Sequence, residues 1–233
     1  MPNAELNLPD SFSGVVRLFP LPNVVLFPGV VQALHIFEPR YKLMVEEAIA
    51  GDQLIAMAMV KPEQLSTAGD RPALFDTICI GKIMTHTKLE DGRYNVLLAG
   101  VRRARILEEV NFELDFRKAR VELLLDSESG EPEDQLQDVR KQVVDQFLKM
   151  LPSQSHLDRA SLDTLLESDV GTGQLVDLIC YSCGAQPMEL QQALEIDSVV
   201  QRARFILKIM RRLAKQIDSS GPVSDFPPSF SLN

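Results

Sequence analysis

The sequence predicts an α+β fold with a β-rich first part and a helical second part. Up to about residue 125 the apolar residues come in short runs of β-prone side chains separated by turn residues, which is the pattern of strands. From about residue 126 they recur every three or four residues, which is the pattern of helices. An acidic, turn-prone segment at 126–134 separates the two patterns. The 233 residues suffice for one large domain or two smaller ones.

The first part contains six predicted strands and one predicted helix. Residues 90–93, with the sequence Glu-Asp-Gly-Arg, predict a hairpin tip, because Asp-Gly tolerates the positive φ that such a turn requires. The helix is expected over about 39–51, where Pro39 suits the first turn and Gly51 the end. The strands are expected at 15–19, 30–36, 54–60, 77–88, 94–107 and 112–125.

The second part contains the predicted helices. The last of them has the most regular spacing, with apolar residues 4, 3, 4, 3 and 4 positions apart from Val199 to Ile217. Asp197 is its expected N-cap, because a short acidic side chain can accept a hydrogen bond from the first turn. The helices are expected at about 132–150, 159–168, 172–182, 187–195 and 198–217.

These patterns give three expected regions. A β domain with the helix at 39–51 covers 13–126, and a helical bundle covers 127–217. The tail at 218–233 is rich in Ser and Pro, and we expect it to be disordered or loosely docked.

The composition limits the classes of partner. The 24 basic and 33 acidic side chains give a net charge of −9, which argues against a general binder of nucleic acid or anionic membranes, since both are polyanions. The longest aliphatic run, Leu54 to Val60, is far shorter than the ~20 residues that cross a bilayer. The first dozen residues have neither a basic start nor an apolar stretch, so we expect no secretory signal and a cytoplasmic protein.

Basic residues gather on the last predicted helix, which carries six of the ten that follow residue 126. Two interpretations stay open: the cationic helix packs onto anionic neighbours, or it forms a basic docking surface. The six residues are Arg202, Arg204, Lys208, Arg211, Arg212 and Lys215.

The motifs of catalytic and metal sites are missing or incomplete. Cys180 and Cys183 have C-x-x-C spacing, but a structural zinc needs four ligands, and only Cys79 and three scattered histidines remain. We therefore interpret both cysteines as buried helical residues. His35 lies in an apolar strand and is expected to be a core or turn residue rather than a base. No nucleophile motif or phosphate loop occurs, so the sequence predicts a protein that is not an enzyme and has no cofactor or metal.

A basic cluster, Arg102, Arg103 and Arg105, lies in the fifth predicted strand. On a strand Arg103 and Arg105 share one face. One hypothesis is a surface ladder paired with Glu108, Glu109 or a neighbouring strand. The other is an anchor for a carboxylate, a phosphate or a peptide backbone.

Three sequence blocks resemble the N-terminal substrate-binding domain of the ATP-dependent Lon protease. They are LFPLPNVVLFPG at 18–29, LHIFEPRY at 34–41 and DGRYNVLLAGVRRARILE at 91–108, in the order and spacing of that family. The helical second part is similar to the family's C-terminal bundle, so the resemblance covers roughly 13–217. It implies a PUA-like β pseudo-barrel followed by a helical bundle.

The resemblance also has implications for function. The chain ends before the ATPase and peptidase domains of Lon would begin, which implies a stand-alone Lon N-terminal-domain protein, a class found chiefly in bacteria. The family domain recognises unfolded or degron-bearing protein segments. The expected function is therefore that of a non-catalytic protein-binding module, such as an adaptor or a holdase for non-native polypeptide.

The candidate peptide-binding residues lie where apolar and charged groups are close in sequence, because apolar anchors supply energy and polar groups fix register. For each residue the alternative is a role in a turn or in the core. The candidates are Leu26, Phe27, Pro28, Phe37, Glu38, Arg40 and Tyr41.

Three other functions stay open. PUA-like domains also bind RNA, although the net charge, the lack of Trp and the presence of only three Tyr favour a protein ligand. An enzyme with an unrecognised site would need a cleft with convergent titratable groups. A homo-oligomer could form if Phe226 and Phe230 of the tail filled a neighbour's groove.

Overall fold

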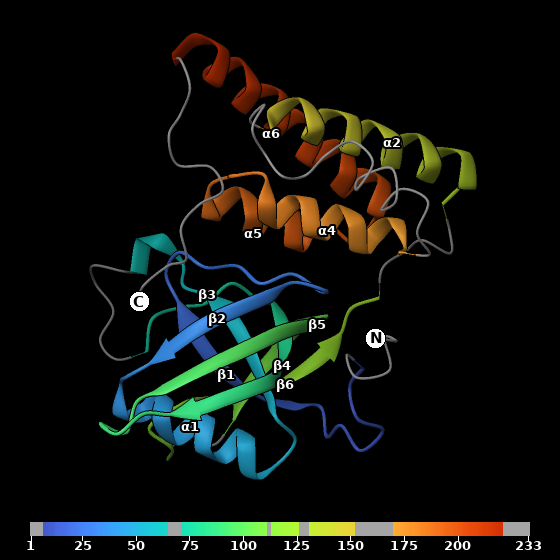
Figure 1. The fold of residues 1–233 in the computed structure, drawn as a ribbon. Coiled ribbons are helices and arrows are strands. Elements are labelled where there is room, and N and C mark those ends of the chain that lie inside the picture. The colour runs from blue at the N-terminus through green and yellow to red at the C-terminus, as the bar shows by residue number, and fades with distance from the viewer. Residues whose placement is uncertain (1–6, 65–70, 111–112, 126–130, 152–169, 221–233) are drawn as a thin grey trace. The chain divides into compact units, whose positions relative to one another are not determined.

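Figure 1 shows the computed structural model, which describes residues 7–64, 71–110, 113–125, 131–151 and 170–220. The chain divides into two compact units, with the boundary between Leu124 and Leu125. Strands and one α-helix form the first unit, and helices form the second, so the predicted α+β class is confirmed.

The described part of the first unit contains the six expected strands and the expected helix. A short 3-10 turn at Pro62–Gln64 follows the third strand. The elements in chain order are β1 (Val15–Leu21), β2 (Val31–Ile36), α1 (Pro39–Ala50), β3 (Leu54–Met59), β4 (Thr77–Lys88), β5 (Tyr94–Val110) and β6 (Arg117–Leu123).

The strands form a sheet that closes on itself. Their order is β2-β5-β4-β3-β1-β6, and β5 also pairs with β6. The long strand β5 makes this closure possible, because residues 94–99 pair with β2 and residues 104–110 pair with β6. The β1–β3 pair is parallel and all the others are antiparallel. The result is the predicted pseudo-barrel of β1, β3, β4, β5 and β6, with β2 attached to the first half of β5.

The hairpin of β5 and β6 differs from the expected boundaries. Strand β5 continues to Val110, beyond the expected end near 107, and β6 begins at Arg117 rather than near 112. The carboxylate of Glu109 accepts a hydrogen bond from Arg117, and Glu108 accepts one from Arg120 (Nε to Oε1, 3.0 Å). Such cross-strand pairs stabilise extended backbone, so these acidic residues remain within the strand.

The barrel interior is apolar. All six residues of β3 are buried, whereas β4 is buried only over its first part and exposed from Met84 onward. Neighbouring strands complete the core with Val16, Leu18, Ile78, Ile80, Ala104, Ala119 and Val121. The second half of β4 therefore extends beyond the barrel core.

Helix α1 packs against β1 and β3. It begins at Pro39, as predicted, and ends at Ala50, just before Gly51. The buried Arg17 side chain ties β1 to the end of this helix, because it donates hydrogen bonds to Glu47 (Nε to Oε1, 2.8 Å) and Asp52 (Nη1 to Oδ1, 2.6 Å). These charge-assisted bonds fix where the helix lies on the barrel.

The described part of the second unit contains four α-helices: α2 (Glu133–Met150), α4 (Thr172–Ser182), α5 (Pro187–Glu195) and α6 (Val199–Ser220). Helices α2 and α6 pack against each other, and both α4 and α5 also contact α6. The expected helix at 159–168 lies outside the described residues.

The ends of α6 differ from the expectation. The cap of its first turn is Ser198 rather than Asp197, because the Ser198 hydroxyl accepts the hydrogen bond from the Gln201 amide (3.1 Å). The helix continues to Ser220, past the expected end at 217, and the rest of the expected tail, with Phe226 and Phe230, lies outside the described residues. No helix among the described residues is long and apolar enough to span a bilayer.

Candidate functional site

Three of the seven candidate residues have buried side chains. Leu26 is 1% exposed, Phe27 0% and Tyr41 6%. The loop that carries the first two is held against β5, since the Gly29 amide donates to the Gly100 carbonyl and the Gly100 amide donates to the Val30 carbonyl. Leu26 and Phe27 therefore belong to the core, and a ligand cannot reach their side chains in this structure.

Tyr41 has its ring in the core as well. Its ring meets Phe19 edge to face, with the centroids 4.7 Å apart. Burial raises the pKa of its hydroxyl, while the nearby Arg40 guanidinium acts in the opposite direction. Tyr41 therefore acts as the buried support on which Arg40 lies, with the guanidinium carbon 4.6 Å from the ring centroid.

The other candidates lie nearer the surface. Phe37 is 50% exposed, directly after β2. Glu38 and Arg40 pair with each other at the start of α1, with 3.0 Å between Arg40 Nε and Glu38 Oε2. Pro28 is partly exposed in the preceding loop. The structure thus brings Phe37, Glu38 and Arg40 together as an apolar and charged group.

Three exposed apolar side chains lie on neighbouring strands of the outer sheet surface, and we call Val31, Leu97 and Met84 the apolar face. Their exposed fractions are 53%, 40% and 44%. Leu97 of β5 is opposite Ala33 of β2 and Thr85 of β4. Val31 lies two positions from Ala33, and Met84 is the extra residue of a β-bulge next to Thr85.

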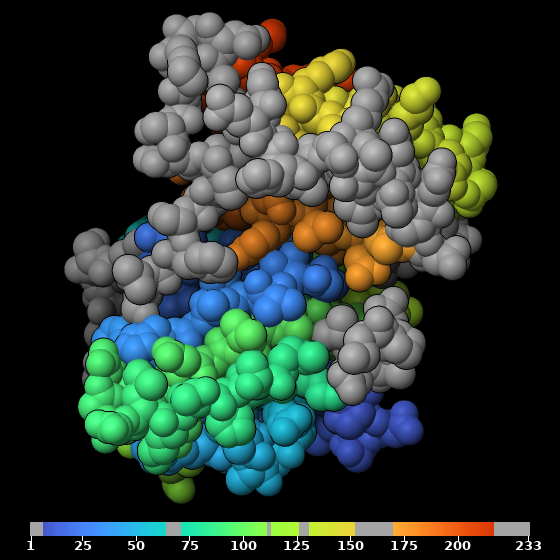
Figure 2. Space-filling model, in the orientation of Figure 1, coloured from blue at the N-terminus to red at the C-terminus, as the bar shows by residue number. Residues whose placement is uncertain are grey.

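The apolar face is turned outward by strand alternation. Gln32 and Leu98, the neighbours of Val31 and Leu97, are buried, and successive strand residues point to opposite sides. Met84, in the bulge, is exposed next to the outward-facing Thr85. Helix α1 does not cover it, because α1 packs on β1 and β3. In Figure 2 the blue atoms of β2 and the green atoms of β5 adjoin at the surface. The sequence analysis does not identify these residues. One signal was present: side chains alternate along a strand, so one of the adjacent residues Leu97 and Leu98 must point outward.

A polar network lies between the apolar face and Phe37. His35 Nε2 is 3.1 Å from an Arg93 guanidinium nitrogen, and His35 Nδ1 is 2.8 Å from Asn95 Oδ1. Because arginine can only donate, Nε2 accepts and the ring proton resides on Nδ1. Arg93 also donates to Asp91, which lowers the pKa of that carboxyl group. His35 thus has partners for both ring nitrogens, as expected for a satisfied residue, but it lies partly exposed in strand β2 rather than in the core or in a turn.

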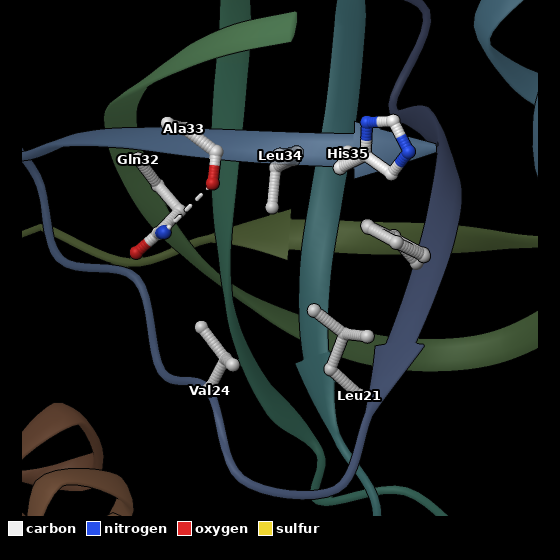
Figure 3. Close-up of a pocket in the computed structure, with 7 residues that line it drawn as sticks. Leu21, Val24, Gln32, Ala33, Leu34 and His35 are labelled. Atoms are coloured by element: carbon white, nitrogen blue, oxygen red, sulfur yellow. Dashed lines mark hydrogen bonds between the residues drawn. The ribbon is translucent and has the colours of Figure 1, made fainter. Parts of the chain in front are cut away.

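A small hollow lies beside this network, between β2 and the end of β1 (Figure 3). Its volume is about 20 Å³, enough for roughly one water molecule and far below the ~300 Å³ of an ordinary ligand pocket. The Gln32 amide nitrogen donates to the Ala33 carbonyl oxygen across its rim (2.9 Å). Its lining residues are Phe19, Leu21, Val24, Gln32, Ala33, Leu34 and His35.

The basic cluster of β5 is not a continuous surface ladder. Arg103 is only 1% exposed, and a β-bulge between Gly100 and Arg102 shifts the alternation of this strand. Arg105 remains exposed and lies 3.8 Å from the carboxylate of Glu122 on β6. Arg103 is therefore buried, on the side of β5 opposite to that of the barrel-core residue Ala104, and only Arg105 fits the surface-ladder hypothesis.

The C-x-x-C pair is buried in the helical unit. Cys180 and Cys183 are 0% and 1% exposed, and Cys183 Sγ lies 3.3 Å from the Cys180 carbonyl oxygen. Burial raises the pKa of the Cys183 thiol to about 11 and that of Cys180 well above its usual value. Both are therefore uncharged thiols at neutral pH, as expected for buried helical cysteines. Among the residues that the structure describes, no group of His, Cys, Asp or Glu is arranged to hold a metal ion.

The basic residues of α6 divide between the two interpretations left open by the sequence. Arg202 pairs with Asp177, and Arg212 pairs with Glu189, as packing onto anionic neighbours requires. Lys208, Arg211 and Lys215 are exposed. A docking role for these three stays a hypothesis.

Comparisons with known proteins agree on one family. The family model for the ATP-dependent protease La (LON) substrate-binding domain matches residues 15–212. Among the curated relatives, the Lon protease of Trichlorobacter lovleyi is 27% identical over 214 residues, which are 89% of this chain and 24% of that protein. The Lon protease of Cytophaga hutchinsonii is 27% identical over 86% of this chain and 24% of its own. The chain thus spans about a quarter of the length of these relatives.

Solved structures support the same fold. The N-terminal domain of Mycobacterium avium complex Lon protease has a TM-score of 0.63 at 17% identity, covering 84% of this chain and 98% of that one. The Lon N-terminal domain protein from Xanthomonas campestris has a TM-score of 0.55 at 19% identity, covering 83% and 97%.

Proposed function

Since the chain belongs to the ATP-dependent protease La (LON) substrate-binding domain family, we propose that it is a non-catalytic module that binds non-native polypeptide segments. The observation that carries this proposal is the match to a substrate-binding family over residues 15–212. The exposed apolar side chains of the sheet supply a surface suited to this role. As an adaptor or a holdase, the protein would hold such segments without changing them covalently.

The apolar face is the proposed anchor of the bound segment. A patch of exposed aliphatic side chains on a sheet marks a surface for association. Val31, Leu97 and Met84 present this chemistry on three adjacent strands. Non-native polypeptides expose apolar side chains that folded proteins bury, so such a patch selects the unfolded state.

The group formed by Phe37, Glu38 and Arg40 is the proposed rim of the same surface. The Phe37 ring lies 6.3 Å from the His35 ring, which places it next to the polar network. An aromatic anchor beside a charged pair suits the edge of an interface, where polar groups fix the register of the ligand. We therefore keep these three residues in the proposed binding surface. Leu26 and Phe27 are removed from it.

The test is the binding of fluorescently labelled, reduced casein, measured by anisotropy, with single-stranded RNA in parallel. Apolar contacts change little with salt, whereas phosphate contacts weaken steeply between about 50 and about 200 mM salt. Casein binding that persists at the higher salt is the expected result. Binding of RNA alone, with loss at the higher salt, would replace the proposal with an RNA-binding function. Absence of casein binding at both salt concentrations would overturn it.

The location of the site is tested with a double variant, Val31→Ser and Leu97→Ser. Burying two half-exposed aliphatic side chains contributes about 2 kcal/mol, so casein binding should weaken by a factor of about ten or more. The matched control is Leu107→Ser, because Leu107 is 57% exposed and lies on the same strand as Leu97, but in the half of β5 that pairs with β6 rather than with β2. Equal losses in the double variant and in the control would exclude the apolar face as the site.

A further inference from the structure

The second half of β4 has a strand on one side only. Pairing of β4 with β3 ends at Lys82, opposite Leu54, while pairing with β5 continues to Lys88, opposite Tyr94. All five residues from Met84 to Lys88 are exposed. Among the described residues, no strand pairs with the other side of this segment, which we call the open edge.

The pairing pattern shows which main-chain groups face the open edge. Because the Gly100 amide donates to the Val30 carbonyl and the β2–β5 register is unbroken, every second residue of β5 from Tyr94 to Gly100 directs its main-chain groups toward β2. Among the residues between them, Asn95 and Leu97 direct their main-chain groups toward β4. Their partners Thr87 and Thr85 therefore face β5, and His86 and Lys88 direct their amide and carbonyl groups outward.

An independent hydrogen bond supports this assignment. The Ile83 amide donates to the Gln53 carbonyl (2.9 Å), on the side of β4 that continues as the open edge. The bulge at Met84 adds one residue, so that the alternation resumes with Thr85 inward and His86 outward.

The outer side of β2, by contrast, is already occupied. The Ala33 carbonyl accepts a hydrogen bond from the Gln32 side chain, and the space beside it holds only about 20 Å³ between Leu21 and Val24. On β1, Pro20 lies between the lining residues Phe19 and Leu21 and has no amide hydrogen to donate. A segment of polypeptide therefore has access to an unoccupied strand edge on β4, not on β2.

We propose that the open edge accepts an extended segment of the bound polypeptide as an additional β-strand. The main-chain groups of His86 and Lys88 would pair with those of the segment, and alternate side chains of the segment would lie on the outer sheet surface beside Met84. Main-chain pairing tolerates many sequences, as recognition of non-native polypeptide requires. This inference rests on the proposed function and specifies how the same surface holds its ligand.

The open edge suits a transiently bound segment better than a second copy of this chain. Lys88 ends the segment, is 57% exposed and pairs with Glu46 (3.0 Å), and an edge lysine of this kind discourages pairing between identical edges. A stable dimer interface buries roughly 1,200 Å² or more, which a five-residue edge does not supply. A non-native segment gains additional contact with the adjoining apolar face.

The direct test is amide hydrogen exchange by NMR on the full chain, with and without reduced casein. The His86 and Lys88 amides should exchange rapidly in the free protein and about tenfold more slowly with saturating casein, since pairing protects an amide from exchange. Casein binding that leaves both amides unprotected would overturn the inference and leave the proposed function intact. Absence of casein binding would overturn both. Protection in the free protein, with doubled mass in sedimentation, would assign the edge to a second copy and also overturn it.

A pair of variants tests the same point by affinity. His86→Pro removes one outward amide without removing a hydrogen bond to β5, and it should weaken casein binding by about fivefold, the effect of one net hydrogen bond. His86→Ala keeps the amide and is expected to bind casein as the wild type does. Equal affinities of the two variants would contradict the inference. If His86→Pro fails to fold, the exchange experiment on the unaltered chain decides.

Discussion

Gly100 of β5 and Phe27, in the loop between β1 and β2, approach each other closely. A Cβ atom on residue 100 would lie 2.1 Å from the Phe27 carbonyl oxygen. Only glycine permits this approach, because any other residue would force the two backbones apart. The contact holds the loop at the point where β2 begins its pairing with β5. It therefore sets the position of Val31 relative to Leu97.

Gly100→Ala is expected to destabilise the first unit by about 1–3 kcal/mol or more, the usual cost of forcing an atom into a packed site. The measurement is the midpoint of urea unfolding followed by circular dichroism. Gly81→Ala is the comparison, because its Cβ would meet the Leu98 side chain at 2.6 Å rather than a backbone atom. A side chain can move where a pinned backbone cannot, so the loss at Gly81 should be smaller. Equal losses would show that the loop yields as easily as a side chain.

Elements with strong local signals could be predicted from the sequence. Strand β4 and helices α4 and α5 have the expected limits, and Gly92 adopts the expected positive φ of 79° at the hairpin tip. In each case the residues that define the element are within one turn or one strand of each other. The pseudo-barrel followed by helices came instead from the family resemblance of the three sequence blocks.

The candidate site was harder to predict, because exposure depends on contacts between distant residues. Leu26 and Phe27 look like an exposed loop, but the loop crosses Gly100, more than seventy positions away in the sequence. Val31 and Leu97 belong to apolar runs typical of buried strands, yet the sheet turns them outward. Arg103 belongs to a basic run typical of a surface strand, yet its side chain is only 1% exposed.

Asp177→Asn is expected to destabilise the helical unit strongly. Asp177 and Arg202 are 1% and 0% exposed in their side chains and lie 2.9 Å apart, so removing the carboxylate charge leaves a buried cation without its counter-charge. Breaking such a pair costs about 3–5 kcal/mol. The matched control is Glu189→Gln, which breaks the more exposed pair with Arg212 and should cost less than about 1 kcal/mol. The measurement is the thermal unfolding of the two variants. A loss of stability in Asp177→Asn no larger than that in Glu189→Gln would contradict the prediction.

The Glu189–Arg212 pair should make a small, pH-dependent contribution to stability. Hydrogen bonding from Arg212 lowers the pKa of Glu189 below the ordinary value of 4.5. A carboxyl group with a lowered pKa in the folded state stabilises the protein at pH values above its unfolded pKa, and the contribution disappears as the pH falls through the folded value. The difference in melting temperature between wild type and Glu189→Gln should therefore be constant from pH 6 to pH 7 and vanish on acidification below about pH 4. A difference that persists there would assign the effect to packing rather than charge.

Cys180 and Cys183 are expected to resist thiol reagents in the folded protein. Burial raises the pKa of Cys183 to about 11, so very little thiolate is present at pH 8, and the thiolate is the reactive form. Treatment with a chromogenic disulfide reagent at pH 8 should label neither cysteine until the helical unit is unfolded in guanidinium, when both should react. Mass spectrometry of the labelled peptides distinguishes them from Cys79, which is also buried. Rapid labelling of Cys183 in the native state would show that the end of α4 opens readily, and would favour a reactive rather than a structural role for this thiol.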